Sequence, residues 1–567
     1  MDVETRNCQN CKNQFNVEPE DFGFYEKMQV PPPTFCPECR FQRRIMFRQE
    51  RTLYKRSCDL CKKEVVSIHA PDTKMVVYCS HCWYSDKWDD GAFYLDYDPK
   101  RNFFEQMMEL HQKAPYSAMI HDYTTLVNSE YVNYAGSLKN CYLIFNADFN
   151  ENVHYSTVVV RNKDSMDSLM LSESELCYEN ICSGKSFRLF FSEDSSNCRD
   201  SYFLKSCTDC SDCYGCVNLR NKQYHIFNES YTKEEYVAKL KEFKINTYSG
   251  LMRAREQARA FWLEYPRKYM HALMNANATG DYVFQSKNAI NCYQTKGIED
   301  ARYCQFLTMG PAKDIYDVTE WGNGIELVVD SVSAGEGTSM VRFCNCACQG
   351  DTLDMEYCMY NLRCKHNFGC INLKGKEYRI LNKQYSPEEY KKMRAEIIQS
   401  MNDRPYVDSS GRVWKYGEFL PYDLSPWAYN ETQAQQYFPL TKEEILKKGW
   451  RWREPVPSQH KVTLPPEKLP DSIRDLQDSI LQEVLGCAKC SKPFKMIPAE
   501  LALLRRFEFP IPRLCPDCRH MERLSRLNPP KLWDRNCAKC NAAFQTAYAP
   551  DRPEIIYCES CYQKEVV

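Results

Sequence analysis

Short apolar segments alternate with polar turns through the middle of the chain, from about residue 128 to residue 385. These segments are too short for helices, and apolar residues no longer recur at helical spacing. Small or apolar residues recur twelve positions apart, at Cys141, Val153, Ser165 and Cys177. A short fixed period of inward positions separated by polar corners is typical of stacked rungs. The pattern predicts a mainly β fold with helical insertions, built on a parallel β-solenoid with asparagine ladders at its corners.

The predicted solenoid is bipartite because its sequence is duplicated. CVNLRNKQYHIFNESY at residues 216–231 matches CINLKGKEYRILNKQY at residues 370–385, which lies 154 positions later. Each copy is followed by a helix start, in which Thr232 or Ser386 is the predicted N-cap and a glutamate follows three residues later. We therefore expect two solenoid halves, each ending in a hairpin-like strand pair and a helix.

The segments around the solenoid predict helices, an extended crossing and a linker. We expect a helix over 103–113, helical segments within 232–275, an extended aromatic and proline-rich stretch within 403–456, a linker over 455–470 and a helix over 471–485. The expected organisation is a double zinc ribbon (1–95), a helical connector (96–127), solenoid half 1 (128–231), helices (232–275), solenoid half 2 (276–385), a helix with extended segment and linker (386–480), and a second double zinc ribbon (481–567).

Eight Cys-x-x-Cys pairs, four at each end of the chain, predict metal binding. They are Cys8/Cys11, Cys36/Cys39, Cys58/Cys61, Cys79/Cys82, Cys487/Cys490, Cys515/Cys518, Cys537/Cys540 and Cys558/Cys561. Each C-terminal cysteine follows its N-terminal counterpart by 479 positions, so the two ends are copies of one module. Two pairs supply the four thiolates of a closed, structural zinc site, and we therefore expect four Zn²⁺. Disulfides would require an oxidising compartment, and redox-active pairs do not usually recur in fours at fixed spacing. Sequential pairing gives two zinc ribbons at each end, whereas alternate pairing gives a cross-braced fold.

The first of these stretches resembles a known family. CQNCKNQFNVEPEDFGFYEKMQVPPPTFCPECR, residues 8–40, is similar to the probable zinc-ribbon domain family in its knuckle, its following phenylalanine, its acidic segment, its proline-rich run and its closing C-P-x-C-R. Residues 487–519 resemble it more weakly, because Leu501-Ala-Leu-Leu stands where the first copy has Phe22-Gly-Phe-Tyr. The family's unit is complete with two knuckles, so the resemblance implies sequential pairing and zinc binding. It implies no activity and does not extend to the middle of the chain.

Composition limits the classes of protein to which the chain can belong. The chain has 567 residues, a net charge of −2 and 32 cysteines. Its start lacks an apolar leader-like segment, and no run of 18 apolar residues occurs. We therefore expect a cytoplasmic protein without a membrane partner, in which the thiols are metal-bound or buried.

Charge is distributed unevenly, with basic ends and an acidic middle. Residues 36–63 contain nine Lys/Arg against three Asp/Glu, whereas residues 141–216 contain six against twelve. The arginines beside the knuckles are candidates for binding a polyanion, because a guanidinium donates paired hydrogen bonds to phosphate. They are Arg40, Arg43, Arg44, Arg48, Arg56, Arg519, Arg523, Arg526 and Arg535. A second interpretation, in which these arginines bind acidic residues of the solenoid, is left open by the same charge distribution.

Other constellations favour no catalytic chemistry. The sequence contains no nucleophile elbow, P-loop, HExxH or Rossmann glycine pattern. The run Cys207, Cys210, Cys213 and Cys216 is spaced like iron–sulfur ligands, but asparagine replaces two of these cysteines in the internal copy.

The sequence therefore predicts a non-catalytic zinc protein that binds nucleic acid or a ribonucleoprotein. The alternatives are a protein-interaction scaffold in which zinc ribbons cap the solenoid and, less favoured, a polysaccharide-active enzyme with a carboxylate cluster at Asp314, Asp317 and Glu320.

Overall fold

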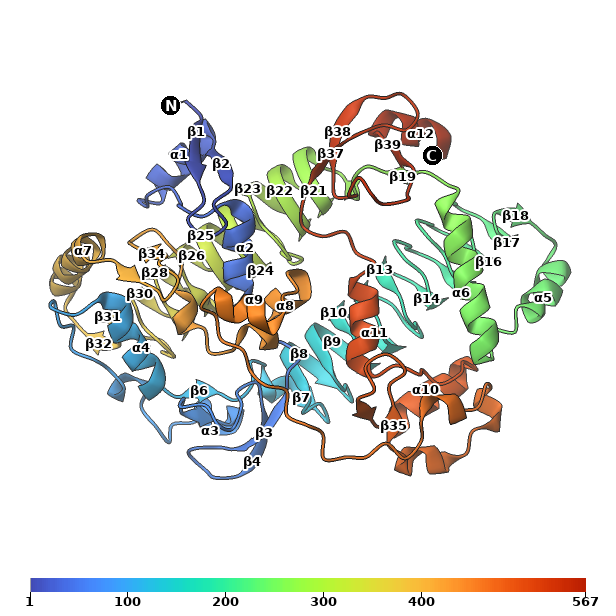
Figure 1. The fold of residues 1–567 in the computed structure, drawn as a ribbon, viewed down its shortest axis with the longest axis horizontal. Coiled ribbons are helices and arrows are strands. Elements are labelled where there is room, and N and C mark those ends of the chain that lie inside the picture. Colours follow the sequence, from blue (N-terminus) through green and yellow to red (C-terminus); the bar gives the residue numbers. More distant parts are fainter. Residues whose placement is uncertain (1, 567) are drawn as a thin grey trace.

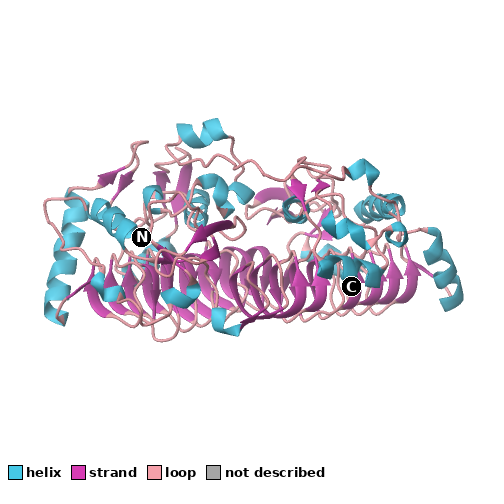
Figure 2. Ribbon diagram, turned by 90° about the horizontal axis from the view of Figure 1, so that it is seen from below, coloured by secondary structure: helices cyan, strands magenta, loops and turns pink. Residues whose placement is uncertain are grey.

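The computed structural model describes residues 2–566, and this part of the chain is mainly β with twelve α-helices. Two arrays of parallel strands form its base. In Figure 1 the first array runs from β7 near the centre toward β17, and the second runs from β21 toward β31 in the opposite direction. Figure 2 shows the strands as one row, with most helices and loops gathered on one side of it.

The arrays are built from short strands in chain order. The first contains β7 (Leu126–Val127), β8 (Val132–Lys139), β9 (Ile144–His154), β10 (Thr157–Val160), β11 (Lys163–Met166), β12 (Leu169–Ser172), β13 (Ile181–Gly184), β14 (Phe187–Phe190), β15 (Arg199–Tyr202), β16 (Ser211–Tyr214) and β17 (Gln223–Ile226). The second contains β20 (Ala272–Leu273), β21 (Ala276–Phe284), β22 (Lys287–Lys296), β23 (Ile298–Arg302), β24 (Ala312–Trp321), β25 (Ile325–Ala334), β26 (Ser339–Arg342), β27 (Asn345–Cys348), β28 (Leu353–Glu356), β29 (Met359–Leu362), β30 (Lys365–Phe368) and β31 (Glu377–Ile380). Antiparallel β18 (Glu229–Ser230) and β32 (Lys383–Gln384) close them.

The strand register confirms the twelve-residue spacing. Ser165 pairs with Val153, and Thr157 pairs with both Phe145 and Leu169, each twelve positions away. In the second array the spacing widens locally, to 14 between β23 and β24 and 13 between β24 and β25. The predicted asparagine ladder is also present at the start of the first array. The amide of Asn128 donates to Asn140, that of Asn140 to Asn152 and that of Asn152 to Asp164, over 3.1, 3.1 and 2.8 Å.

A second period, of three residues, lies within the twelve. Cys207, Cys210, Cys213 and Cys216 are each at most 1% exposed. Each follows a residue with positive φ, at positions 206, 209, 212 and 215. The chain therefore turns at every third residue and sends the next side chain inward. The spacing of these four cysteines, which resembled that of a metal site, is the spacing of the core.

Serine and cysteine exchange along the inner wall because they make the same hydrogen bond. Ser201 donates its hydroxyl to the carbonyl two residues earlier at 2.7 Å, and the thiols of Cys210 and Cys213 do so at 3.3 Å. The Ser201 hydroxyl also accepts from the backbone N–H of Cys213, twelve residues later. Because its polar group is hydrogen-bonded to nearby backbone, such a small side chain can be buried without the free-energy cost of an unpaired polar group.

Helices lie at the ends of the arrays and above them. They are α4 (Phe103–Lys113), α5 (Lys233–Glu242), α6 (Tyr248–Leu263), α7 (Pro387–Asp403), α8 (Gln433–Tyr437) and α9 (Lys442–Lys447). The expected caps are confirmed, since Thr232 and Ser386 each form a capping box with the glutamate three residues on. The helix expected over 103–113 is also confirmed.

The helix expected over 471–485 is wrong. The structure has two short 3-10 turns there, Ile473–Asp475 and Asp478–Gln482. Asp471 accepts hydrogen bonds from the N–H and hydroxyl of Ser249, and Ser472 caps only the first turn. The long-range bonds to Ser249 hold the segment against α6, and the Ser472 side chain bonds to nearby backbone in place of a regular helix.

Candidate metal centres

The two ends of the chain form modules of matching construction. The first contains β1 (Glu4–Asn7), β2 (Gln14–Val17), α1 (Pro19–Lys27), α2 (Pro37–Ile45), β3 (Tyr54–Ser57), β4 (Glu64–Ser67), β5 (Val77–Tyr78) and α3 (Ser80–Trp83). The second contains β35 (Leu485–Gly486), β36 (Pro493–Phe494), α10 (Pro498–Phe507), α11 (Pro516–Leu524), β37 (Trp533–Asn536), β38 (Ala543–Thr546), β39 (Ile556–Tyr557) and α12 (Glu559–Val566).

The sixteen module cysteines gather into four groups of four. These groups are Cys8/Cys11/Cys36/Cys39, Cys58/Cys61/Cys79/Cys82, Cys487/Cys490/Cys515/Cys518 and Cys537/Cys540/Cys558/Cys561, and the sulfurs of each lie within 4.8 Å of one another. Consecutive pairs thus share a group, as sequential pairing requires. The sulfurs of Cys11 and Cys36 are 3.7 Å apart, far beyond the roughly 2.05 Å of a disulfide. Each group can hold a metal ion.

Local structure brings the four sulfurs together. In each group the first pair lies in a tight hairpin turn, closed by a residue of positive φ after the second cysteine: Lys12, Lys62, Ser491 or Asn541. The second pair lies at the start of a helix, where Cys36, Cys79 and Cys515 are N-caps. A helix N-terminus favours the negatively charged thiolate.

Backbone N–H groups favour the thiolate as well. The sulfur of Cys487 accepts from the N–H of Cys515 at 3.3 Å, and that of Cys537 accepts from the N–H of Cys558 at 3.3 Å. Burial raises the pKa of Cys487, but the N–H groups of Cys490 and Cys515 outweigh it and bring this pKa to about 6. The thiolate is the form that binds a soft metal.

Most of the arginines beside the knuckles are buried within the molecule. Arg40, Arg43, Arg44, Arg48, Arg519 and Arg523 are between 0 and 7% exposed. Helix α2, which carries the first three, packs on β24 and β25 of the second array, and α11 packs on β12 of the first (Figure 1). The prediction that these arginines form a polyanion-binding surface therefore needs correction, because a buried guanidinium cannot reach an external phosphate.

In the first module, the arginines pair with carboxylates of the second array. Arg40 Nε lies 2.9 Å from Asp317 Oδ2, and Arg44 Nη1 lies 3.1 Å from Asp317 Oδ1 and 3.0 Å from Asp330 Oδ1. Arg43 pairs with Asp330 and with Glu418 of the extended segment. The remaining arginine of this set, Arg48, pairs with Glu50 and Glu320.

The second module repeats the arrangement on the first array. Arg519 Nη1 lies 2.8 Å from Asp167 Oδ2, and Arg523 Nη1 lies 2.9 Å from Asp167 Oδ1. Arg526 pairs with Glu193 at 3.1 Å and with Glu179 at 3.5 Å. Each terminal module is thus held by the array that lies farther from it in the sequence. We call these two sets of buried ion pairs the arginine clamps.

The other predicted residues also have internal partners. Arg56 and Arg535, 479 positions apart, both donate to the carbonyl of an alanine fourteen residues later, Ala70 or Ala549, at 3.2 Å. The three acidic residues considered for catalysis are paired as well, Asp314 with Lys27, Asp317 with Arg40 and Arg44, and Glu320 with Arg48. The Cys207–Cys216 run forms no metal group among residues 2–566.

Comparisons with known proteins add no assignment. No family model matches the sequence, and no curated protein matches it. A solved structure described as a "putative acetyltransferase" from Desulfovibrio desulfuricans G20 aligns with 47% of this chain and 71% of its own, at 9% identity and a TM-score of 0.10. A score so low carries no argument about fold or activity. Within residues 2–566, no helix is both long and apolar enough to cross a bilayer.

Proposed function

We propose that the protein is a non-catalytic, zinc-stabilised scaffold for binding other proteins. In this proposal the two arrays are the halves of a bipartite β-solenoid, and the terminal modules are double zinc ribbons that lock the halves together. The observation that carries it is the pair of arginine clamps. Buried ion pairs add little net stability, but they penalise every arrangement that leaves a charge unpaired, so they fix where each module docks.

Zinc is the metal that best suits the four groups. Four thiolates are soft ligands, and a tetrahedral Cys₄ group is typical of structural zinc. With all four positions filled by the protein, the ion leaves no site for a substrate. None of the 32 cysteines, all of which lie within residues 2–566, forms a disulfide, which fits the reducing cytoplasm proposed as the location.

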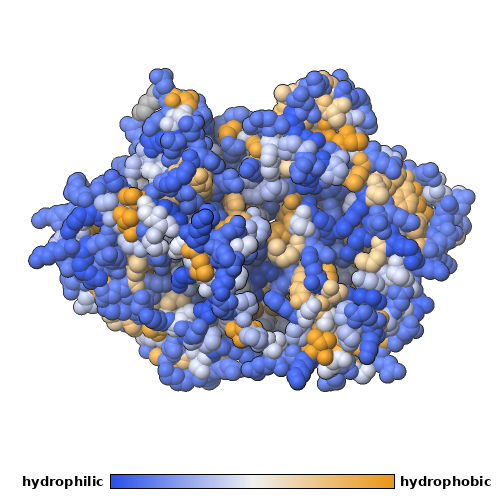
Figure 3. All heavy atoms as spheres, viewed as in Figure 1, coloured by the Kyte–Doolittle hydropathy of each residue, from blue (hydrophilic) through white to orange (hydrophobic). Residues whose placement is uncertain are grey.

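The uncovered sides of the arrays are the proposed docking surface. Their exposed residues alternate in charge, as in the pairs Lys139–Glu151 at 2.9 Å and Lys287–Glu299 at 3.0 Å. A row of mixed charge does not match a polyanion, whereas a protein surface can complement it. The opposite side, where the modules lie, is largely hydrophilic with scattered apolar groups (Figure 3).

Site-specific photo-crosslinking tests the proposal. A photoreactive residue at exposed Lys185 or Arg199 of the first array should capture one or a few defined proteins in the native cell. The same residue at exposed Lys447 of α9 is the control and should not capture them. Capture from all three positions alike, or from none, would refute a specific docking surface on the arrays.

Nucleic-acid binding remains the second candidate, on a different basis from the buried arginines. The knuckle turns carry exposed lysines in both modules: Lys12, Lys62, Lys489, Lys492 and Lys539. Lysines held at turn tips can contact phosphate. Fluorescence anisotropy with a single-stranded RNA should then show binding that weakens steeply with salt and falls after Lys489→Glu with Lys492→Glu, but not after Lys447→Glu. An RNA affinity that changes neither with salt concentration nor with these lysine substitutions would exclude this function.

A further inference from the structure

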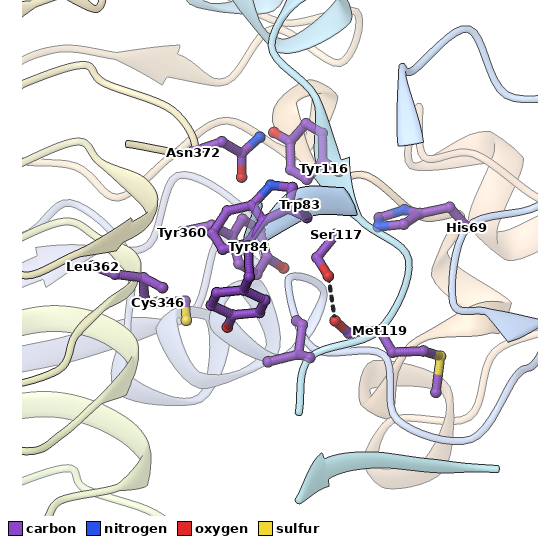
Figure 4. A pocket seen from close by; sticks show the side chains of 11 residues that line it. His69, Trp83, Tyr84, Tyr116, Ser117, Met119, Cys346, Tyr360, Leu362 and Asn372 are labelled. Carbon is purple, nitrogen blue, oxygen red and sulfur yellow. Dashed lines mark hydrogen bonds between the residues drawn. The ribbon is translucent and has the colours of Figure 1, made fainter. Parts of the chain in front are cut away.

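The side of the arrays that the terminal modules cover is closely packed. Where the first module meets β29, Trp83 and Tyr84 of the module and Tyr360 and Leu362 of the strand line a cavity of about 40 Å³ (Figure 4). This volume has room for water molecules and for nothing larger. A partner is therefore better placed on the uncovered side of the arrays.

The first array carries a row of alternating charge. The members of this row are partners in the strand register, each twelve positions from the next. Its lysines are exposed, its glutamates are partly exposed, and Lys139 pairs with Glu151 at 2.9 Å. We call this row the first charge ladder: Lys139, Glu151, Lys163 and Glu175.

The second array carries the same sequence of charges. The strand register again links neighbouring members, and Lys287 pairs with Glu299 at 3.0 Å. Among residues 2–566, no side chain of either row forms a hydrogen bond or an ion pair with a terminal module. Both rows are therefore free to contact a partner. We call this row the second charge ladder: Lys287, Glu299, Lys313 and Glu326.

The two ladders lie side by side and run in opposite directions, as the arrays do in Figure 1. Asn146, which lies between the first two members of the first ladder, donates to Glu320, between the last two members of the second, at 2.7 Å. Tyr282, just before the second ladder, donates to Asp194, just after the first, at 2.8 Å. The ladders are therefore level with each other to within one strand spacing, about 5 Å.

A row of alternating charge is complementary to its own reverse. Lys-Glu-Lys-Glu read backwards is Glu-Lys-Glu-Lys, so two such ladders that face each other in opposite directions place every lysine opposite a glutamate. A parallel approach places like charges opposite each other, which is unfavourable. A two-fold axis parallel to the arrays, beneath their uncovered side, brings the first ladder of one copy onto the second ladder of the other. The same axis forms this contact twice and closes the assembly.

The residues beside the ladders also differ in size in a matching way. In the first array, Phe149 and Arg161 stand two residues before a ladder member, and the guanidinium of Arg161 lies over the Phe149 ring at 5.0 Å. The Phe149 side chain is 51% exposed. At the corresponding positions of the second array stand Gly297 and Gly324, which share the positive φ of the other two residues. The projecting side chains of one array thus have space above the other.

We propose that the uncovered side of the arrays binds a second copy of this chain, with the first charge ladder of each copy lying antiparallel against the second charge ladder of the other. The inference rests on the proposed function, in which this side binds protein, and it names one such partner. Lys185 and Arg199, the crosslinking positions, lie outside both ladders. The contacts between copies are Lys139 with Glu326, Glu151 with Lys313, Lys163 with Glu299, and Glu175 with Lys287.

Sedimentation velocity of the full-length, zinc-loaded protein tests the proposal. The wild type should form a dimer whose dissociation constant rises with salt concentration, because exposed charges are screened. Lys139→Glu with Lys163→Glu makes the first ladder uniformly acidic, so the contacts of both positions become repulsive and the dimer should weaken about 10-fold or more. Lys233→Glu with Lys241→Glu on exposed positions of α5 makes the same change in charge. This matched control should leave dimerisation unchanged.

A compensating variant separates the charge contact from damage to the fold. Glu299→Lys with Glu326→Lys makes the second ladder uniformly basic, and this variant alone should also dimerise weakly. An equimolar mixture of the acidic and basic double variants should form a heterodimer at least as tight as the wild-type dimer, because the uniformly acidic ladder then faces the uniformly basic one. Each variant should keep the zinc content and unfolding temperature of the wild type, since exposed ion pairs contribute little stability.

Two outcomes would overturn the proposal: a wild type that is monomeric at every concentration, or a mixture that associates no better than its separate components. Capture of other proteins at Lys185 by such a monomer would still support the scaffold function. A dimer that captures only its own chain would refute the scaffold and retain this interface, so the two failures are distinguishable.

Discussion

Arg44 Nη1 lies 3.1 Å from Asp317 Oδ1, a residue 273 positions further along the chain, and both side chains are at most 2% exposed. Arg523 and Asp167 repeat this pair in the other half of the molecule, across 356 positions in the opposite direction. Asp167 and Asp317 both have positive φ, 53° and 58°. The same buried arginine–aspartate pair therefore joins a terminal module to an array in both halves of the molecule.

Removal of one clamp arginine is expected to be severely destabilising. Arg523→Met leaves Asp167 facing Arg519 alone and should cost about 3–5 kcal/mol, because a buried charge loses a partner. Urea denaturation and hydrogen exchange across residues 487–561 measure the effect. Arg505→Met, which removes an exposed ion pair with Asp478 on the same module, is the control and should cost less than about 1 kcal/mol. Similar losses in the two variants would contradict the clamp.

The two classes of cysteine are expected to respond differently to substitution. Cys490→Ser removes a metal ligand and should lower the bound zinc from four ions to three. Cys210→Ser changes an inner-wall residue whose thiol donates to the carbonyl of Thr208, as a serine hydroxyl can. Metal analysis should find four zinc ions in this second variant. A loss of zinc from Cys210→Ser would reassign the wall cysteines as ligands.

Asp148 is expected to make stability depend on pH near neutrality. Burial, with the nearby carboxylates of Glu336 and Asp122, raises the pKa of Asp148 to about 6 from 3.8. A raised carboxyl pKa means that the folded state holds its proton more tightly, so this residue favours folding below pH 3.8 and the benefit is lost as pH rises through about 6. Asp148→Asn should therefore add about 1–2 kcal/mol at pH 7.5 and progressively less toward pH 5. A gain that does not change with pH would show that Asp148 is not the titrating group.

Gly280 is expected to tolerate no side chain. Its φ is +129°, and an added Cβ would lie 1.7 Å from the carbonyl oxygen of Cys292. Gly280→Ala should therefore distort the bulge between β21 and β22 and reduce soluble yield. Gly350→Ala, where nothing lies within 4 Å of an added Cβ, is the control and should behave as the wild type. Equal solubility and thermal stability of the two variants would contradict this constraint.

Local patterns in the sequence were sufficient to predict the elements whose cause is local. The period of twelve at Cys141, Val153 and Ser165, the asparagine ladder, and the caps at Thr232 and Ser386 all arise from contacts within a few residues or between residues twelve positions apart. The period of three was visible at Cys207–Cys216 but resembled metal-ligand spacing, because cysteine serves both purposes.

The residues with which the clamp arginines pair could not be predicted from the sequence. Arg44 and Asp317 are separated by 273 positions, and nothing near either residue specifies the other. The sequence showed only that basic ends and an acidic middle could attract one another.

Zinc content of the full-length chain, purified under reducing conditions, tests the central claim most directly. Inductively coupled plasma mass spectrometry should find four zinc ions per chain. Chelation should then release them, expose sixteen thiols to alkylation and increase hydrogen exchange in residues 4–83 and 487–561. Two or fewer zinc ions per chain, or terminal modules that remain protected after complete chelation, would contradict the account.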